Sequence, residues 1–195
     1  MPPHADPALE KRILDAARRL WRRGGEKALT MRAVAAAART TTPTVYGRFR
    51  NKREIMRELR FLIRQELFEV LSKTKTPREV CERYISFAFA HPYDYRLLTE
   101  SWTLTHSGVE PRPTSELMKQ RLADMFGGDP AEYARLTMAL WAMLHGMVML
   151  AISGRADTAL REEMRDAFME AFDTLSVAVQ ASRATELTGT TQAAL

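Results

Sequence analysis

The polar side chains with the clearest chemical pattern lie in residues 29–53, which read LTMRAVAAAARTTTPTVYGRFRNKR. Threonine hydroxyls can bond to base edges or phosphates, and a threonine methyl or a proline ring can pack on a thymine methyl. The phenol of Tyr46 and the ammonium of Lys52 suit phosphate oxygens, and the N–H groups at a helix N-terminus attract the same anion. This mixture of hydroxyls and cations indicates a surface that contacts DNA.

Two short helices must position these groups. Thr30 is a good N-cap for a first helix that runs to about Ala37. A break at residues 39–41 follows. A second short helix is then predicted over residues 43–49, with Thr41 or Thr42 as its N-cap and a proline in its first turn.

The second short helix has one apolar side. Val45 and Phe49 are four residues apart and can both face the core, which leaves the threonine, proline and tyrosine side chains facing outward. Arg32, Arg48 and Lys52 flank this outward face. A short exposed helix surrounded by cations is what a helix-turn-helix needs, because the helix enters the major groove while the cations hold the phosphates.

The charge distribution supports a polyanionic partner. Residues 1–60 hold 15 basic and 6 acidic side chains, a net charge of +9, whereas residues 61–195 hold 14 basic and 18 acidic ones, a net charge of −4. Nucleic acid and an anionic membrane surface are the two candidate partners of such a basic head. A membrane-surface protein needs large exposed apolar groups on its basic helices, whereas residues 30–50 offer mostly alanine and threonine.

Residues 9–60 resemble the TetR family of bacterial transcriptional regulators. The resemblance rests on Ile13-Leu14-x-Ala16-Ala17, on Leu29-Thr30-Met31-Arg32-x-Val34-Ala35, and on Thr44-Val45-Tyr46-x-x-Phe49-x-Asn51-Lys52-x-x-Ile55. It implies a dimer with a DNA-reading N-terminal domain and a ligand-sensing C-terminal domain. The positions that match the family's DNA face are Thr30, Arg32, Thr41, Thr42, Pro43, Thr44, Tyr46 and Lys52, to which we add Gly47, Arg48 and Arg39.

Arg39 is a departure from the family pattern, which commonly has glycine in this turn. A left-handed conformation at a non-glycine residue costs on the order of 1 kcal/mol. We therefore expect either a slightly remodelled turn or an additional phosphate contact from the Arg39 guanidinium.

The apolar spacing predicts an all-α protein of about nine helices. The helices outside the short pair are expected over residues 7–23, 51–75, 77–90, 92–105, 112–126, 130–153 and 157–182, with Gly24-Gly25 ending the first. We predict a DNA-binding domain over residues 1–50, an effector-binding and dimerisation domain over residues 51–182, and a frayed tail over residues 183–195.

The C-terminal part carries a weaker resemblance. Trp141-x-x-x-His145-Gly146, with His91-Pro92 upstream, is similar to one class of TetR C-terminal domain. Trp141 and His145 share a helix face and either line a ligand cavity or fill the core. The candidate pocket residues are apolar or aromatic with few polar handles, which suits a mostly apolar effector. They are Tyr84, Phe87, Trp102, His106, Phe126, Trp141 and His145.

The last two helices are the candidate dimer interface. The stretch from residue 136 to residue 154 has no formal charge, so it is long enough to span a bilayer, but a helix that is apolar all round can equally be buried between other helices. We expect burial, with two helices from each subunit forming a symmetric four-helix bundle. Packing of both helices within one chain is the alternative.

Other functional classes lack their motifs. The sequence has no HExxH, GxSxG, Walker or GxGxxG pattern, its four histidines are far apart, and its one cysteine excludes an internal disulfide. We therefore expect no enzyme, no metal and no cofactor. No secretory signal is visible, so we predict a cytoplasmic, ligand-responsive regulator, a repressor released from a palindromic operator, with an activator as the alternative.

Overall fold

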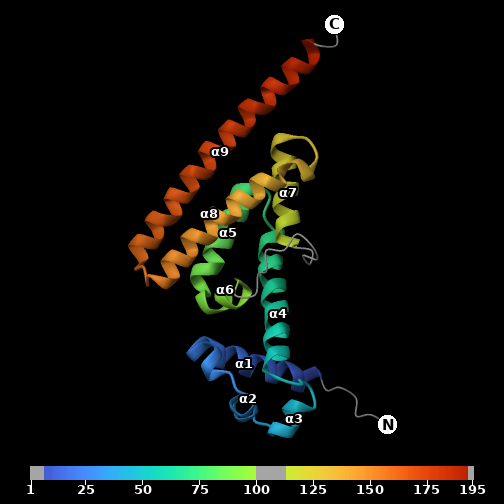
Figure 1. Ribbon diagram of the computed structural model, residues 1–195, viewed down its shortest axis with the longest axis vertical. Helices are drawn as coiled ribbons and strands as arrows, with labels where there is room; N and C mark the ends of the chain where they lie inside the picture. Colours follow the sequence, from blue (N-terminus) through green and yellow to red (C-terminus); the bar gives the residue numbers. More distant parts are fainter. Residues whose placement is uncertain (1–6, 100–112, 193–195) are drawn as a thin grey trace, which may run out of the picture. The chain divides into compact units, whose positions relative to one another are not determined.

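The computed structural model describes residues 7–99 and 113–192 (Figure 1). These residues form nine α-helices and one 3-10 helix, and no strand occurs among them. The chain divides into two compact units. Of the described residues, unit 1 holds 7–66 and 91–99, and unit 2 holds 67–90 and 113–192. Unit 1 thus extends beyond the predicted domain boundary at residue 50 and takes in a later helix.

Unit 1 is built from α1 (Pro7–Ala28), α2 (Met31–Ala37), α3 (Thr42–Tyr46), α6 (Pro92–Thr99) and most of α4 (Lys52–Ser72). Its core forms because α1, α2, α3 and α4 each present apolar residues at helical spacing to a common interior. The fully buried members are Ile13, Ala16, Ala17, Leu29, Val34, Val45, Ile55 and Ile63. Helix α1 contributes Ile13, Ala16 and Ala17 to this core.

The two glycines near the end of α1 divide it into a long regular helix and a short helical segment. Gly24 and Gly25 have non-helical backbone angles, and Gly25 has a φ of +58° and a ψ of −145°. A second, short helical segment follows this kink and ends at Ala28, so the predicted end of the first regular helix at Gly24-Gly25 is confirmed. The kink directs the chain towards Leu29, whose side chain is fully buried.

Unit 2 contains α5 (Pro77–Ala90), α7 (Pro113–Phe126), the 3-10 helix η1 (Pro130–Tyr133), α8 (Ala134–Ser153) and α9 (Thr158–Gln192), together with the end of α4. Helix α5 packs against α7, α8 and α9, and α8 lies beside α9 (Figure 1). The bounds of α5 match the prediction. The core lies around α5 and includes Val80, Ile85, Leu122, Leu144, Val148 and Phe172.

Helix α9 is longer than the sequence predicts. It continues to Gln192, whereas the sequence predicts a frayed tail from residue 183. Arg183 contributes to this extension, because its guanidinium hydrogen-bonds to the carboxylate of Glu132 and to the hydroxyl of Tyr133. These contacts fasten the helix to η1, which the composition of the segment does not indicate.

Helix α8 is apolar on nearly all sides but is not enclosed within the chain. The segment Pro130–Ser153 is long and apolar enough to cross a membrane, and only 28% of its most apolar window is buried. Met138 and Leu150 are each 69% exposed. The expected burial of this helix is therefore not achieved by one copy of the chain.

Candidate nucleic-acid interface and effector region

The turn between α2 and α3 is a Schellman motif. The N–H of Thr40 donates to the carbonyl of Ala35 at 3.0 Å, and the N–H of Arg39 donates to the carbonyl of Ala36 at 3.2 Å. Arg39 has a φ of +53°, the left-handed conformation that usually favours glycine at this position. The turn is therefore regular and not remodelled, although Arg39 does adopt the left-handed conformation. The additional phosphate contact from Arg39 stays a prediction.

Threonine side chains cap both short helices. The Oγ1 of Thr30 accepts from the N–H of Ala33 at 3.1 Å, and the Oγ1 of Thr41 accepts from the N–H of Thr44 at 3.3 Å. The hydroxyls of Thr41 and Thr44 are also 2.7 Å apart. Thr41, not Thr42, is thus the cap of α3, and α3 begins one residue earlier than predicted and ends at Tyr46.

Helix α3 has the buried and exposed sides that the sequence predicts. Val45 is 0% exposed and Phe49 is 3% exposed, whereas Tyr46 is 53% exposed. The chain from Tyr46 to Phe49 stays tightly turned, because the N–H groups of Arg48 and Phe49 both donate to the carbonyl of Val45. All the predicted DNA-contacting residues lie in unit 1, and each is exposed or partly exposed. They are Thr30, Arg32, Arg39, Thr41, Thr42, Pro43, Thr44, Tyr46, Gly47, Arg48 and Lys52.

Lys52 has a partner that the sequence did not reveal. Its Nζ lies 2.8 Å from the Oε1 of Glu26, which follows the kink in α1. The hydrogen bond from Lys52 lowers the pKa of the Glu26 carboxyl, with a smaller contribution from the charge of Arg53. The predicted phosphate-binding cation is therefore already paired with a carboxylate.

A buried carboxylate joins α6 to α1. Asp94 is 0% exposed, and its Oδ2 accepts from the guanidinium of Arg18 at 2.8 Å and from that of Arg22. Arg18 also makes a bidentate contact with Glu66 on α4, at 2.6 Å for each nitrogen. Burial opposes ionisation of Asp94, but the hydrogen bonds from Arg22 and Arg18 outweigh burial and lower its pKa. No local spacing could reveal this network.

The predicted effector residues that the structure describes lie on three helices of unit 2. Tyr84 and Phe87 are on α5 and are each 8% exposed. Trp141 and His145 are on α8, with ring centroids 5.0 Å apart and stacked at 13°, as their shared helix face predicts. Phe126 ends α7, and its ring lies 6.2 Å from that of Tyr133. Trp102 and His106 lie outside the described residues.

Two further features of α8 bear on effector binding. Burial lowers the pKa of His145, which favours the neutral imidazole, a form with one donor and one acceptor nitrogen. Thr137, one turn before Trp141, is 7% exposed, and its hydroxyl has no hydrogen-bond partner within the described part of the chain. An unsatisfied buried hydroxyl is costly. The sequence does not single out Thr137, because a threonine at this spacing resembles core filler.

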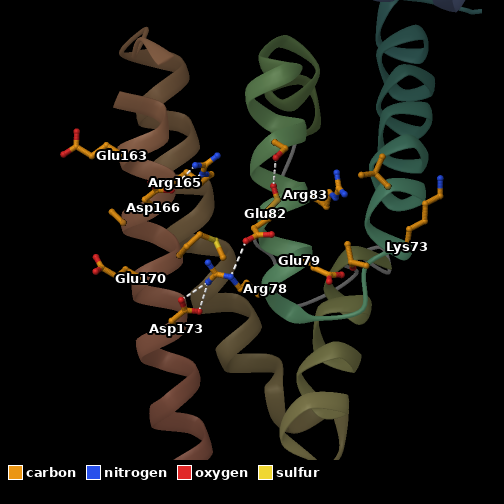
Figure 2. A pocket seen from close by; sticks show the side chains of 15 residues that line it. Lys73, Arg78, Glu79, Glu82, Arg83, Glu163, Arg165, Asp166, Glu170 and Asp173 are labelled. Atoms are coloured by element: carbon orange, nitrogen blue, oxygen red, sulfur yellow. Dashed lines mark hydrogen bonds and ion pairs between the residues drawn. The ribbon is translucent and has the colours of Figure 1, made fainter. Parts of the chain in front are cut away.

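An open groove of about 1560 Å³ lies between α5, the end of α4, and α9 (Figure 2). Its wall carries four basic and six acidic side chains, and none of the predicted effector residues lines it. Arg78 crosses it, with its Nη1 2.7 Å from Asp173 and its Nε 3.3 Å from Glu82. This charged groove does not have the apolar character expected of the effector pocket.

Cys81 has no features of a nucleophile. It is 1% exposed, and burial raises the pKa of its thiol to about 12. Because the thiolate is the reactive form, this cysteine is inert at neutral pH.

Solved structures share this fold. A transcriptional regulator (TerR/AcrR family) from Aquifex aeolicus VF5 is 13% identical, with a TM-score of 0.65 over 86% of this chain and 99% of the other. The minocycline complex of a TetR variant from Acinetobacter baumannii AYE is 21% identical, with a TM-score of 0.64 over 88% and 96%. A TetR-family transcriptional regulator from Haemophilus influenzae RD is 18% identical, with a TM-score of 0.57 over 86% and 98%.

Two protein-family models match the sequence, although no curated protein matches it significantly. "Bacterial regulatory proteins, tetR family" matches residues 13–59, which contain the helix-turn-helix. "Tetracyclin repressor-like, C-terminal domain" matches residues 78–175, which is half of the chain by itself. Together with the capped α2–α3 pair, these matches show that the protein belongs to the TetR family of DNA-binding transcriptional regulators.

Proposed function

We propose that this TetR-family regulator is a cytoplasmic repressor that binds a palindromic operator as a homodimer and leaves it when a small, mostly apolar effector binds. The observation that carries the proposal is the outward face of α3. Tyr46 is 53% exposed on a short helix whose opposite side, at Val45, is fully buried. Such a helix presents its polar face to the major groove while nearby cations meet the phosphates.

A second copy of the chain is the proposed cover for α8 and α9. The exposed side of α8 carries Met138, Met143 and Leu150, interleaved with the small residues Ala142 and Gly146. Small residues let another helix approach closely, and exposed apolar patches mark interfaces. Two helices from each copy would form the four-helix bundle predicted from the sequence.

The proposed dimer determines the form of the operator. A twofold axis presents two α3 helices, which meet successive major grooves about 34 Å apart. The operator should therefore be an inverted repeat. This geometry is a consequence of isologous symmetry, in which each copy uses the same surface.

The effector is proposed to bind beside Trp141 and His145, with Thr137 as its polar anchor. The stacked rings offer an apolar surface, and the unsatisfied hydroxyl of Thr137 offers a hydrogen bond to a ligand. The TetR variant from Acinetobacter baumannii, which has a similar fold, binds minocycline in its crystal structure. An effector can change operator affinity only through its different affinities for the two states of the dimer. Helix α4 runs from unit 1 into unit 2 and is the proposed connection.

A basic protein that associates with membrane surfaces is less favoured. Such a protein would insert large apolar side chains from its basic helices. The exposed face of α2 carries Arg32 and Ala36 instead, and the two most exposed large apolar side chains of the described residues, Met138 and Leu150, belong to α8 in unit 2.

Selection from a random-sequence duplex library tests the DNA-binding proposal. The wild-type protein should enrich an inverted repeat with half-site centres about one helical turn apart. A Tyr46→Ala variant should lose this enrichment, while Tyr93→Ala, which changes a comparably exposed tyrosine of unit 1 outside the helix-turn-helix, should keep it. Enrichment of sites without twofold symmetry would contradict binding as a symmetric homodimer.

Transcription from a promoter that contains the selected repeat separates a repressor from an activator. With purified polymerase, addition of the protein should lower transcript yield. A rise in yield would support the activator instead. Compounds that raise the melting temperature of the protein are then tested for restoring transcription, and Thr137→Val should weaken the response to a true effector without lowering stability.

A further inference from the structure

The Lys52–Glu26 ion pair places a carboxylate where DNA phosphate is proposed to bind. Lys52 is the first residue of α4, and its Nζ is 2.8 Å from the Oε1 of Glu26. The lysine side chain is 33% exposed and that of the glutamate is 64% exposed, so an incoming anion can reach both.

Glu26 is isolated among cations in the sequence. Between Asp15 and Glu54 it is the one acidic residue, whereas the same stretch has eleven lysines and arginines. A carboxylate in such surroundings repels phosphate and therefore opposes DNA binding. Fold stability gives little reason for the pair, because an exposed ion pair contributes little.

We propose that Glu26 is an intramolecular competitor of DNA phosphate, which occupies the ammonium of Lys52 in the free protein. This inference rests on the proposed phosphate contact of Lys52. When DNA binds, a phosphate oxygen replaces the Glu26 carboxylate on Nζ, and Glu26 returns to solvent. The exchange lowers DNA affinity and also lowers its salt dependence, because the released Glu26 carboxylate takes up cations and offsets the counterion that Lys52 displaces from DNA.

A double-mutant cycle tests this competition. The probe is a duplex recovered by the wild-type protein from a random-sequence library, with a scrambled duplex of equal length beside it. Dissociation constants are measured at several salt concentrations for the wild type, Glu26→Gln, Lys52→Gln and the double variant. The matched control is Glu10→Gln, which removes one negative charge from the same helix far along the sequence from Lys52. Thermal melting shows that each variant is folded, and Glu26→Ala serves as a second variant.

Competition predicts a specific pattern. Glu26→Gln should tighten binding to both duplexes by up to about fivefold, which corresponds to the free energy of a surface ion pair. The slope of the logarithm of affinity against the logarithm of salt concentration should steepen by up to about one released ion. In the Lys52→Gln background the gain should fall below about twofold, and Glu10→Gln should give no comparable gain.

Failure of the Lys52 phosphate contact and failure of the competition would give different results. If Lys52→Gln binds as tightly as the wild type, the phosphate contact of Lys52 is wrong and the basis of the inference is lost. If Lys52→Gln weakens binding but neither Glu26 variant strengthens it, the DNA contact stands and the competition is overturned. An equal gain with and without Lys52, or an equal gain from Glu10→Gln, would show plain charge repulsion and also overturn the competition.

Discussion

Arg18 donates two hydrogen bonds to Asp94, at 2.8 and 3.1 Å, across 76 residues of sequence. The carboxylate is entirely buried, and Arg22 binds it from the next turn of α1. The indole N–H of Trp21 adds a bond to the carbonyl of Tyr93 at 2.8 Å. Three neighbouring residues of α1 therefore hold the start of α6, and this attachment belongs to the unit that carries the helix-turn-helix.

Asp94→Asn should destabilise unit 1. Removal of one member of a buried ion network leaves the others unpaired, and the expected loss in the free energy of unfolding is about 3 kcal/mol. Chemical denaturation measures this loss. Asp173→Asn is the control, because Asp173 pairs with Arg78 at an exposed site and should cost less than about 1 kcal/mol. If Asp94→Asn also costs less than about 1 kcal/mol, the Asp94 network does little for stability.

The same carboxylate predicts an acid response. The pKa of Asp94 is lowered in the folded protein, so its contribution to stability is fully present above the unfolded pKa of about 3.9 and disappears as the pH falls through the lower folded value. The wild type should therefore lose stability steeply below about pH 4. Asp94→Asn, which has no proton to take up at this position, should show a shallower loss in denaturation curves measured from pH 6 to pH 2. If the stability of the wild type and that of Asp94→Asn fall equally with pH, the lowered pKa of Asp94 is contradicted.

Arg39→Gly should separate fold stability from DNA binding. Arg39 and Arg155 both adopt left-handed backbone conformations, with φ of +53° and +52°. Glycine relieves the strain of this conformation, so each substitution should leave stability unchanged or raise it by up to about 1 kcal/mol. Only Arg39→Gly should weaken DNA binding and reduce its salt dependence, because Arg155 lies in the turn between α8 and α9. Undiminished binding by Arg39→Gly would remove this arginine from the DNA face.

Thr44→Ala and Tyr46→Phe should have different effects on operator recognition. The hydroxyl of Thr44 lies on the outward side of α3 and should read a base, so its loss should change sequence preference by about 1 kcal/mol at one position of the repeat. The phenol of Tyr46 should bind phosphate, so its loss should weaken all duplexes alike. Repeated library selection with each variant measures both effects, and Tyr93→Phe controls for loss of an exposed phenol. An unchanged preference for Thr44→Ala would exclude it from base reading.

Met138→Glu should break the proposed dimer. Met138 is 69% exposed on α8, so a charge there is harmless in a monomer but is buried without a partner in the four-helix bundle. Sedimentation should show a monomer, and operator affinity should fall by at least about tenfold as the second α3 is lost. Met125→Glu, at a methionine of α7 that is 55% exposed, should remain dimeric. A dimeric Met138→Glu would place the interface elsewhere.

The sequence alone determined the helix-turn-helix, because its determinants are local. The caps at Thr30 and Thr41 act within three residues, and the spacing of Val45 and Phe49 sets which side of α3 is buried. The stacking of Trp141 on His145 follows from the same helical repeat. These caps, buried sides and ring contacts depend on residues within about one helical turn of each other, so they follow once the helix has formed.

Only the tertiary structure decided which charges meet. Lys52 is paired with Glu26 and Asp94 is paired with Arg18, across 26 and 76 residues, and neither separation follows from a periodicity. The exposure of α8 was also decided at this level, because apolar composition shows that a surface must be covered but not whether the same chain covers it. Electrostatic partners and buried faces depend on where distant segments come to lie, and that arrangement results from packing of the whole core.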